Sequence, residues 1–498
     1  MMLNDLILGF SVAATPINLF YCLMGSLFGT LVGVLPGVGP VVTIAVLLPA
    51  TFALEPTSAL IMLAGIYYGA QYGGSTTSIL LNLPGETSSV VTCLDGHAMA
   101  RQGRAGPALA VSALGSFFAG CAATLLIALF SPLLGAIAVR FGPADYFSLM
   151  VVGLVGAVVL AQGSLLKAVS MIVLGLLLGL VGTDVNSAVS RFDFGLPELA
   201  DGINFVVLAM GLFGIGEIIV TLERRKDEEG TVIPHGRVWP SRDDVRQSWK
   251  PVLRGTALGS LLGLLPGGGT ALASFAAYAL EKKLSRSPER FGKGAIEGVA
   301  APESANNAAA QTSFIPLLTL GLPSNAVMAL MVGAMMIHGI TPGPQIMTSR
   351  PDLFWGMIAS MWIGNLMLVL LNMPMIGLWV RLLRIPYRLL YPAILLFACI
   401  GIYSVSNSAF DVGLAAAFGL LGYVLVKAAF EPAPLLLGFI LGPLMEENLR
   451  RAMTMSRGDA GVFLREPVSL VLLLLAAALL ALTLLPAVKR GRQEVFVE

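Results

Sequence analysis

Two clusters of hydroxyl and amide side chains interrupt long apolar stretches of this sequence. The clusters are Gln71, Ser75, Thr76, Thr77, Ser78 and Asn82, and then Asn306, Asn307, Gln311, Thr312 and Ser313. A single Ser or Thr in an apolar helix usually bonds its own backbone, but five or six polar groups together need other partners. They could bind carboxylate oxygens, or coordinate a hard cation together with backbone carbonyls. Neither cluster contains Lys or Arg, so bound cations would have to balance the charge of an anionic ligand.

Glu303 precedes the second cluster, in the stretch Ala-Pro-Glu-Ser-Ala-Asn-Asn. An ionisable group inside an apolar segment is a functional candidate. We therefore take Glu303, Gln311 and Thr312 as candidates for binding a coupling cation. A role for Glu303 at the start of a helix is equally compatible with its position.

Two Pro-Gly motifs could supply backbone ligands. Leu-Pro-Gly-Val-Gly-Pro spans residues 35–40, and Leu-Pro-Gly-Gly-Gly-Thr spans residues 265–270. Proline and successive glycines interrupt a helix, which frees N–H groups that attract anions and carbonyls that attract cations. The alternative is a tight turn at the membrane surface. The candidate binding residues in these motifs are Pro36, Gly37, Gly39, Pro266, Gly267, Gly269 and Thr270.

The motifs belong to a longer internal similarity. Residues 25–39 and 255–269 are identical at eight of fifteen positions, at a constant offset of 230. Asn82-Leu-Pro-Gly follows the first copy, and Gly321-Leu-Pro-Ser follows the second. Glycines at every fourth position (25, 29, 33 and 255, 259, 263) predict close helix packing without a ligand role. Repeated Gly/Pro-interrupted apolar segments are the sequence feature that best indicates the substrate site of a transporter.

The elements that must position these groups are membrane helices. Charged residues make up 12% of the chain, whereas a soluble domain carries roughly 25%. The formal net charge of +1 lacks the basic excess of a nucleic-acid-binding protein. Residues 107–139 contain no Asp, Glu, Lys or Arg, and the apolar runs lack the alternation of barrel strands. We expect an all-α polytopic membrane protein with roughly 11–14 membrane segments, including broken helices or re-entrant hairpins, built on two inverted repeats.

Five regions are expected along the chain. They are a first transport repeat (1–140), connecting membrane helices (141–222), a polar cytoplasmic loop (223–254), the core of a second transport repeat (255–350) and C-terminal membrane helices (351–498). The loop is assigned to the cytoplasm because of its eight Lys and Arg residues. Phosphate-loop, zinc-protease and nucleophile-elbow motifs are missing, and the three histidines are isolated. We therefore expect no enzyme activity, no cofactor and no metal other than a transported Na⁺.

Several long motifs resemble the large membrane subunit of the tripartite tricarboxylate transporters, the TctA family. They are the paired Leu-Pro-Gly-x-Gly elements and the stretches 67–78, 82–86, 92–109 and 301–309, and the resemblance covers nearly the whole chain. It maps the family's motifs onto Pro36, Gly37, Gly39, Ser75, Thr76, Asn82, Pro84, Gly85, Pro266, Gly267, Gly269, Asn306, Asn307, Pro323 and Ser324. We add Thr77, Thr270 and Asn325 to the candidate substrate-binding residues. We interpret the Asp95–Gly96 region as a loop that gates the site or contacts a binding protein.

The resemblance implies a secondary transporter of the bacterial inner membrane that imports citrate or a related carboxylate and is driven by Na⁺ or H⁺. It implies two partners, a periplasmic solute-binding protein and a small membrane subunit. An elevator-like movement of the repeats is expected by analogy with other carboxylate carriers. The alternative is a membrane scaffold or channel subunit without alternating access.

Overall fold

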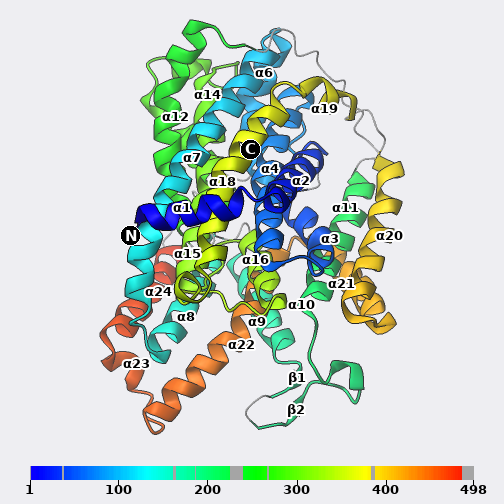
Figure 1. The fold of residues 1–498 in the computed structure, drawn as a ribbon, viewed down its shortest axis with the longest axis vertical. Helices are drawn as coiled ribbons and strands as arrows, with labels where there is room; N and C mark the ends of the chain where they lie inside the picture. The colour runs from blue at the N-terminus through cyan, green and yellow to red at the C-terminus, as the bar shows by residue number, and fades with distance from the viewer. Residues whose placement is uncertain are drawn as a thin grey trace.

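The computed structural model describes residues 2–35, 39–160, 164–184, 187–224, 239–265, 269–382 and 387–484. Nearly all of its regular structure is helical (Figure 1). The first half contains α1 (Met2–Ala13), α2 (Pro16–Gly33), α3 (Pro40–Thr51), α4 (Pro56–Leu81), η1 (Thr87–Ser89), α5 (Val90–Thr92), η2 (Cys93–His97), α6 (Ala98–Arg101), α7 (Ala105–Ala138), α8 (Pro143–Leu160), α9 (Leu165–Gly179), η3 (Pro197–Leu199), α10 (Phe205–Ala209), η4 (Met210–Ile215) and α11 (Gly216–Arg224). Strands β1 (Gly182–Thr183) and β2 (Ser190–Arg191) form a small antiparallel hairpin at the bottom of the view in Figure 1.

The second half of the chain continues the helical pattern. It contains α12 (Arg242–Gly263), α13 (Gly269–Leu284), η5 (Pro288–Arg290), α14 (Glu297–Thr312), α15 (Phe314–Leu320), α16 (Ala326–Ile337), α17 (Ile346–Ser349), α18 (Pro351–Asn372), α19 (Ile376–Leu382), α20 (Tyr387–Ser406), α21 (Ala409–Lys427), α22 (Pro432–Met455), α23 (Val462–Arg465) and α24 (Pro467–Leu484).

Many of these helices are apolar enough to lie in lipid. Five segments of the described chain have the length and hydropathy to cross a membrane: α2, α7, α10 through α11, α18 and α21. Seven shorter apolar helices accompany them, among them α3, α8, α16 and α24. The expected all-α polytopic membrane protein is therefore confirmed. The number of crossings and the inverted arrangement stay predictions.

Two helices with polar sequences form the centre of the protein. Helix α4 is buried from Thr57 through Leu80, and α14 is buried from Gly298 through Thr312. Helix α4 packs on α2 and α18, and α14 packs on α12, α7 and α13; α12, α14 and α7 run alongside one another in Figure 1. The polar clusters predicted from the sequence thus lie inside the protein, except for Asn82, which is exposed at the end of α4.

The glycine-rich faces of α2 and α12 explain the close approach to these central helices. A Cβ added at Gly25, Gly29 or Gly33 would collide with a backbone carbonyl of α4. A Cβ added at any of the three matching glycines of α12 would collide in the same way with α14. The prediction that both stripes serve packing is confirmed.

Residues 223–224 and 242–254 of the predicted loop, 223–254, are helical. Helix α11 reaches Arg224, residues 225–238 lie outside the described chain, and α12 begins at Arg242. The helix begins here because Ser241 and Asp244 form a capping box: the Ser241 hydroxyl accepts from Asp244 N–H (3.1 Å), and Ser241 N–H donates to the Asp244 carboxylate (2.9 Å). The polar residues from Arg242 onward therefore form the first part of α12 rather than a loop.

Candidate functional site

Helix α4 presents the first polar cluster. It begins with Pro56 and ends at Asn82, whose left-handed backbone (φ 59°) stops the helix. The Thr77 and Ser78 hydroxyls donate to the carbonyl of Gly74 within the helix, at 3.0 and 2.9 Å. Ser75 is different, because its hydroxyl also reaches a carboxylate of another helix.

That carboxylate belongs to Glu303 of α14, which is 1% exposed. Ser75 of α4 donates to one carboxylate oxygen, and Thr92 of α5 donates to the other. In the described part of the chain, no Lys or Arg forms an ion pair with Glu303. Burying a charge without an opposite charge costs roughly several kcal/mol, so this carboxyl group is a candidate for binding a proton or another cation.

Asn307 and Gln311 follow Glu303 along one face of α14, at intervals of four residues. The Asn307 amide donates to Ser116 of α7 (2.7 Å) and to the Glu303 carbonyl (3.1 Å). The side-chain carbonyl oxygens of Asn306, Asn307 and Gln311 are buried without a hydrogen-bond partner among the described residues. These three acceptors suit a hard cation or a hydroxyl of a ligand.

A second acidic residue, Glu86, is half-buried and caps the start of η1. Its carboxylate accepts from Ser88 and from the Asn306 amide (3.3 Å), so it lies one turn of α14 away from Glu303. Ser88 also contacts the Gln71 side chain of α4 (3.2 Å). The described Lys and Arg side chains form no ion pair with Glu86 either.

Two residues of the Pro-Gly motifs, Gly39 and Gly269, lie at the starts of helices near this acidic segment. A Cβ added at Gly39, directly before α3, would be 4.0 Å from the Glu86 Cβ, at the outer limit of van der Waals contact. Helix α13, which begins at Gly269 (φ 55°), packs against η1. Pro36, Gly37, Pro266 and Gly267 lie outside the described residues.

The hairpin at residues 321–325 completes the arrangement. Gly321 ends α15 in a left-handed conformation (φ 71°), and Asn325 caps α16 by accepting from Met328 N–H (2.9 Å). The Asn325 amide donates to the Tyr67 hydroxyl of α4 (3.4 Å), and Tyr67 interacts electrostatically with Glu86. Ser324, 1% exposed, keeps a buried hydroxyl without a partner among the described residues.

The remaining predicted residues lie on the same elements. Thr76 is buried on α4, and the Thr312 hydroxyl donates to its own helix at Ala308 (3.0 Å). Pro84 and Gly85 form the turn after α4, where a Gly85 Cβ would collide with the Gly33 carbonyl. Pro323 lies in the equivalent turn before α16, and Thr270 lies in the first turn of α13.

Sequence reasoning missed Glu86, Thr92 and Ser116. Glu86 and Thr92 belong to the stretches that carry the family resemblance, so an acidic residue between apolar segments was available as a signal. Ser116 had no such signal, because it is one hydroxyl in a 34-residue apolar helix. Its contacts with the Asn307 amide and with the Glu303 carbonyl distinguish it.

The Asp95–Gly96 region, interpreted as a loop that gates the site or contacts a binding protein, is helical instead; the two roles stay predictions. Asp95 is fully buried in the π-helical turn η2. Its carboxylate accepts from the N–H groups of Gly294 and Ala295 (2.8 Å each) and from the Tyr278 hydroxyl (2.9 Å). Asp95 thus attaches the segment carrying Thr92 to the start of α14, which carries Glu303.

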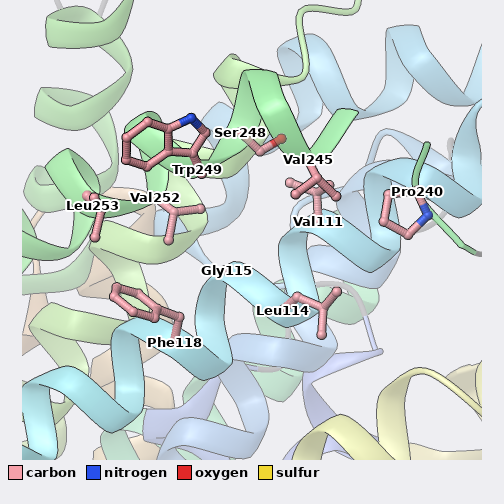
Figure 2. A pocket seen from close by; sticks show the side chains of 10 residues that line it. All are labelled: Val111, Leu114, Gly115, Phe118, Pro240, Val245, Ser248, Trp249, Val252 and Leu253. Atoms are coloured by element: carbon pink, nitrogen blue, oxygen red, sulfur yellow. The ribbon is translucent and has the colours of Figure 1, made fainter. Parts of the chain in front are cut away.

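An apolar groove of about 310 Å³ lies elsewhere, between α7 and α12 (Figure 2). Its lining includes Leu114, Phe118, Trp249 and Leu253, which are all exposed. Its one hydroxyl, on Ser248, donates to the Asp244 carbonyl (2.6 Å). The groove contains no Lys, Arg or amide side chain, and its polar groups are only the Ser248 hydroxyl and the Trp249 indole N–H. The polar network around Glu86 and Glu303, which holds several hydroxyls and amides, is therefore the candidate site.

Comparison with known proteins identifies the family. Residues 19–437 match the Tripartite tricarboxylate transporter TctA family. An Agrobacterium vitis protein, described as an uncharacterized 52.8 kDa protein in the TAR-I ttuC′ 3′ region, is 59% identical over 497 residues, which cover 100% of this chain and 99% of that protein. A second A. vitis protein, described as an uncharacterized protein in the TAR-II ttuC′ 3′ region, is 65% identical over 240 residues, or 48% of this chain and 99% of that protein. No solved structure matches. The chain therefore belongs to the TctA family and is a multi-pass membrane protein with a transport role, the large subunit of a tripartite tricarboxylate transporter.

Proposed function

We propose that this chain is the permease subunit of a binding-protein-dependent secondary transporter that imports a tricarboxylate or a related organic carboxylate, coupled to a cation gradient. The observation that carries the proposal is a pair of carboxyl groups, buried Glu303 and half-buried Glu86, inside a network of amides and hydroxyls. Buried ionisable groups in membrane proteins typically belong to ion or substrate pathways.

The substrate carboxylates are held by helix starts, hydroxyls and amides. Helix α3 begins beside Glu86, and α16 begins after Ser324 and Asn325, whose cap is joined to Tyr67. A helix start carries partial positive charge and N–H groups that favour anions. The unpartnered hydroxyl of Ser324 gives the start of α16 a further donor for a carboxylate oxygen.

The proposed coupling to a cation follows from the negative charges of the substrate and of the two carboxyl groups. An anionic substrate beside Glu86 and Glu303 would be repelled if both carboxyl groups were ionised, because like charges in a poorly hydrated interior repel strongly. A cation that arrives with the substrate removes this repulsion. The unpartnered oxygens of Asn306, Asn307 and Gln311 are the type of ligand that Na⁺ would use, and a carboxyl group is the type of site that H⁺ would use.

The family supports the proposed context. A tripartite system requires a periplasmic solute-binding protein and a small membrane subunit, and it works in the bacterial inner membrane. An elevator-like movement of the two halves remains our expectation for alternating access, by analogy only. The competing possibility is a scaffold or channel subunit, which would conduct without a gradient or not at all.

Uptake of radiolabelled citrate into liposomes tests the proposal. The liposomes contain the chain and the small subunit, with the binding protein outside. We expect accumulation that depends on an imposed Na⁺ or H⁺ gradient. Asn307→Ala and Thr76→Ala should abolish it, while the control Asn448→Ala should not, because that amide bonds its own helix on α22 (2.8 Å to the Leu444 carbonyl). Gradient-independent flux would reject the proposed function. Normal uptake by both Asn307→Ala and Thr76→Ala would reject the proposed site.

A further inference from the structure

The hydroxyl of Ser75 lies between two acceptors. Its oxygen is 3.1 Å from the Gln71 carbonyl and within hydrogen-bond distance of one Glu303 carboxyl oxygen. A hydroxyl has one hydrogen, so it can donate to only one of them at a time. Both contacts are hydrogen bonds at once only if Glu303 is protonated and donates to Ser75, which then donates to Gln71.

The rest of the Glu303 surroundings fit a neutral carboxyl group. The Thr92 hydroxyl contacts the other carboxyl oxygen. The two partners, Ser75 and Thr92, are neutral, and Glu303 is 1% exposed. A neutral carboxyl in this place satisfies every hydrogen bond without requiring a buried unpaired charge.

Glu86 differs in its donors. Ser88 and Asn306 both donate to its carboxylate, and Gln71 lies beside it. Ser88 also lies between two acceptors, Glu86 and the Gln71 carbonyl oxygen. However, a half-turn of the Gln71 amide would direct its unpartnered NH₂ group at Ser88 and resolve that conflict without a proton. An ionised Glu86 is therefore compatible with its neighbours.

We propose that Glu303 is a proton-binding site and that its proton is the coupling cation of the transport cycle; this inference rests on the proposed function. A proton from the outer aqueous phase adds to the carboxylate oxygen that faces Ser75. The new O–H donates to Ser75, and the Ser75 hydrogen turns to the Gln71 carbonyl. Release to the inner aqueous phase reverses both steps, and no other bond forms or breaks.

Other titratable groups surround Glu303 on the elements packed against α14. Tyr72 on α4, Glu86 before η1 and Cys93 on η2 interact with it electrostatically. Asp95 on η2 is held by Tyr278 of α13 and the start of α14. Helix α7 contains Cys121 but no Asp, Glu, Lys, Arg or His, and Arg254 of α12 pairs with Glu281 of α13 (2.5 Å). Among these groups, Glu86 is the acidic side chain that interacts electrostatically with Glu303.

The test uses the complete system in liposomes, with radiolabelled citrate and either a pH gradient or a Na⁺ gradient imposed alone. We expect the pH gradient, acid outside, to drive accumulation by the native protein. Glu303→Gln, which mimics the protonated group, should lose this accumulation but keep citrate exchange across the membrane without a gradient. The control Glu447→Gln removes a surface acid that pairs with Arg451 on α22, and it should behave like the native protein.

Three results would overturn the proton site. The first is full pH-driven accumulation by Glu303→Gln. The second is accumulation by the native protein that only a Na⁺ gradient drives. The third applies if Glu303→Gln does not fold, and it is the absence of a protonated-carboxyl infrared band from the native protein at neutral pH. In the second case transport still occurs, so the proposed function survives. A native protein that accumulates no citrate under either gradient would instead contradict the proposed function itself.

Discussion

The molecule contains two similar arrangements of helices. One consists of α2, α4 and the turn that follows α4, and the other consists of α12, α14 and the turn that follows α15. Three glycines of each first helix contact the backbone of the second, at Met62, Ile66 and Ala70 in one half and at Ala301, Ala305 and Ala309 in the other. The three alanines of α14 are numbered 239 higher than the corresponding residues of α4. At the same offset, left-handed Asn82 corresponds to left-handed Gly321, Pro84 to Pro323, and the cap Glu86 (φ −151°) to the cap Asn325 (φ −155°).

The contacts between the halves are also reciprocal. Helix α3 of the first half packs on α16 of the second, and α13 of the second half packs on η1 of the first. This exchange is what a pseudo-two-fold relation between two copies would produce, and it supports our proposal of a duplicated unit.

The acidic residues of the site are not repeated in the two halves. Glu86 corresponds to the neutral Asn325, and Glu303 corresponds to Ala64. Each half therefore contributes one acidic residue, at positions that are not equivalent. The comparison indicates that the helix packing and turns can be kept in two copies while the ionisable groups diverge, because packing needs small residues and turns whereas coupling needs one carboxyl in a particular place.

The largest expected effect comes from breaking the shared packing. Gly29→Leu and Gly259→Leu should each prevent formation of folded protein, because a side chain at either position meets a backbone carbonyl that cannot move aside. The matched control is Gly413→Leu on α21, where an added Cβ meets nothing within 4 Å. Size-exclusion chromatography of detergent-solubilised protein measures the difference. A normal, monodisperse profile for Gly29→Leu or Gly259→Leu would show that the two stripes are not required for folding.

Removing the connection between the halves should have the next largest effect. Asp95→Ala leaves two backbone N–H groups and the Tyr278 hydroxyl buried without an acceptor, which should lower the free energy of unfolding by about 3 kcal/mol. Asp95→Asn should cost less, since one side-chain oxygen remains. Thermal unfolding compares both with Asp193→Ala, which loses a single surface hydrogen bond to Gly195. Equal midpoints for Asp95→Ala and the control would contradict the structural role.

Glu86 and Asn325 cap equivalent helical turns in the two halves, but only Glu86 is ionisable. Asn325→Ala should destabilise the protein by about 1 kcal/mol through loss of the α16 cap. Glu86→Gln should change stability less and abolish citrate accumulation. Unfolding midpoints and liposome uptake, measured on the same preparations, separate the two effects. Our assignment of Glu86 to transport fails if Glu86→Gln accumulates citrate at the native rate.

The smallest predicted effect is a pH dependence at the start of α12. Burial raises the pKa of the Asp244 carboxyl, but hydrogen bonds from Ser241 and the charge of Arg104 together leave that pKa below its ordinary value. Asp244 therefore stabilises the folded state above the ordinary Asp pKa of about 3.9, and this contribution is lost as the pH falls through the lower folded value. The difference in midpoint between native protein and Asp244→Asn should shrink on acidification. A difference that grows toward acid pH would have the wrong sign.

The sequence predicted the helical membrane class, the glycine packing and the polar clusters, since each depends on local pattern. It could not predict which polar groups meet. The hydroxyls of Thr77 and Thr312 bond their own helices, whereas Ser75, from the same cluster as Thr77, reaches Glu303, 228 residues later. Nor could the sequence show that Asp95 is buried, because its partners are two backbone N–H groups and a tyrosine nearly 200 residues away.

The central claim is that the substrate binds where the two halves meet, among Glu86, Asn306 and the starts of α3 and α16. A cryo-electron microscopy map of the complex of this chain and its small subunit with citrate tests it most directly. We expect citrate density within hydrogen-bond distance of the Asn306 amide and the backbone after Gly39. Citrate density in the groove between α7 and α12, with none beside Glu86, would contradict it.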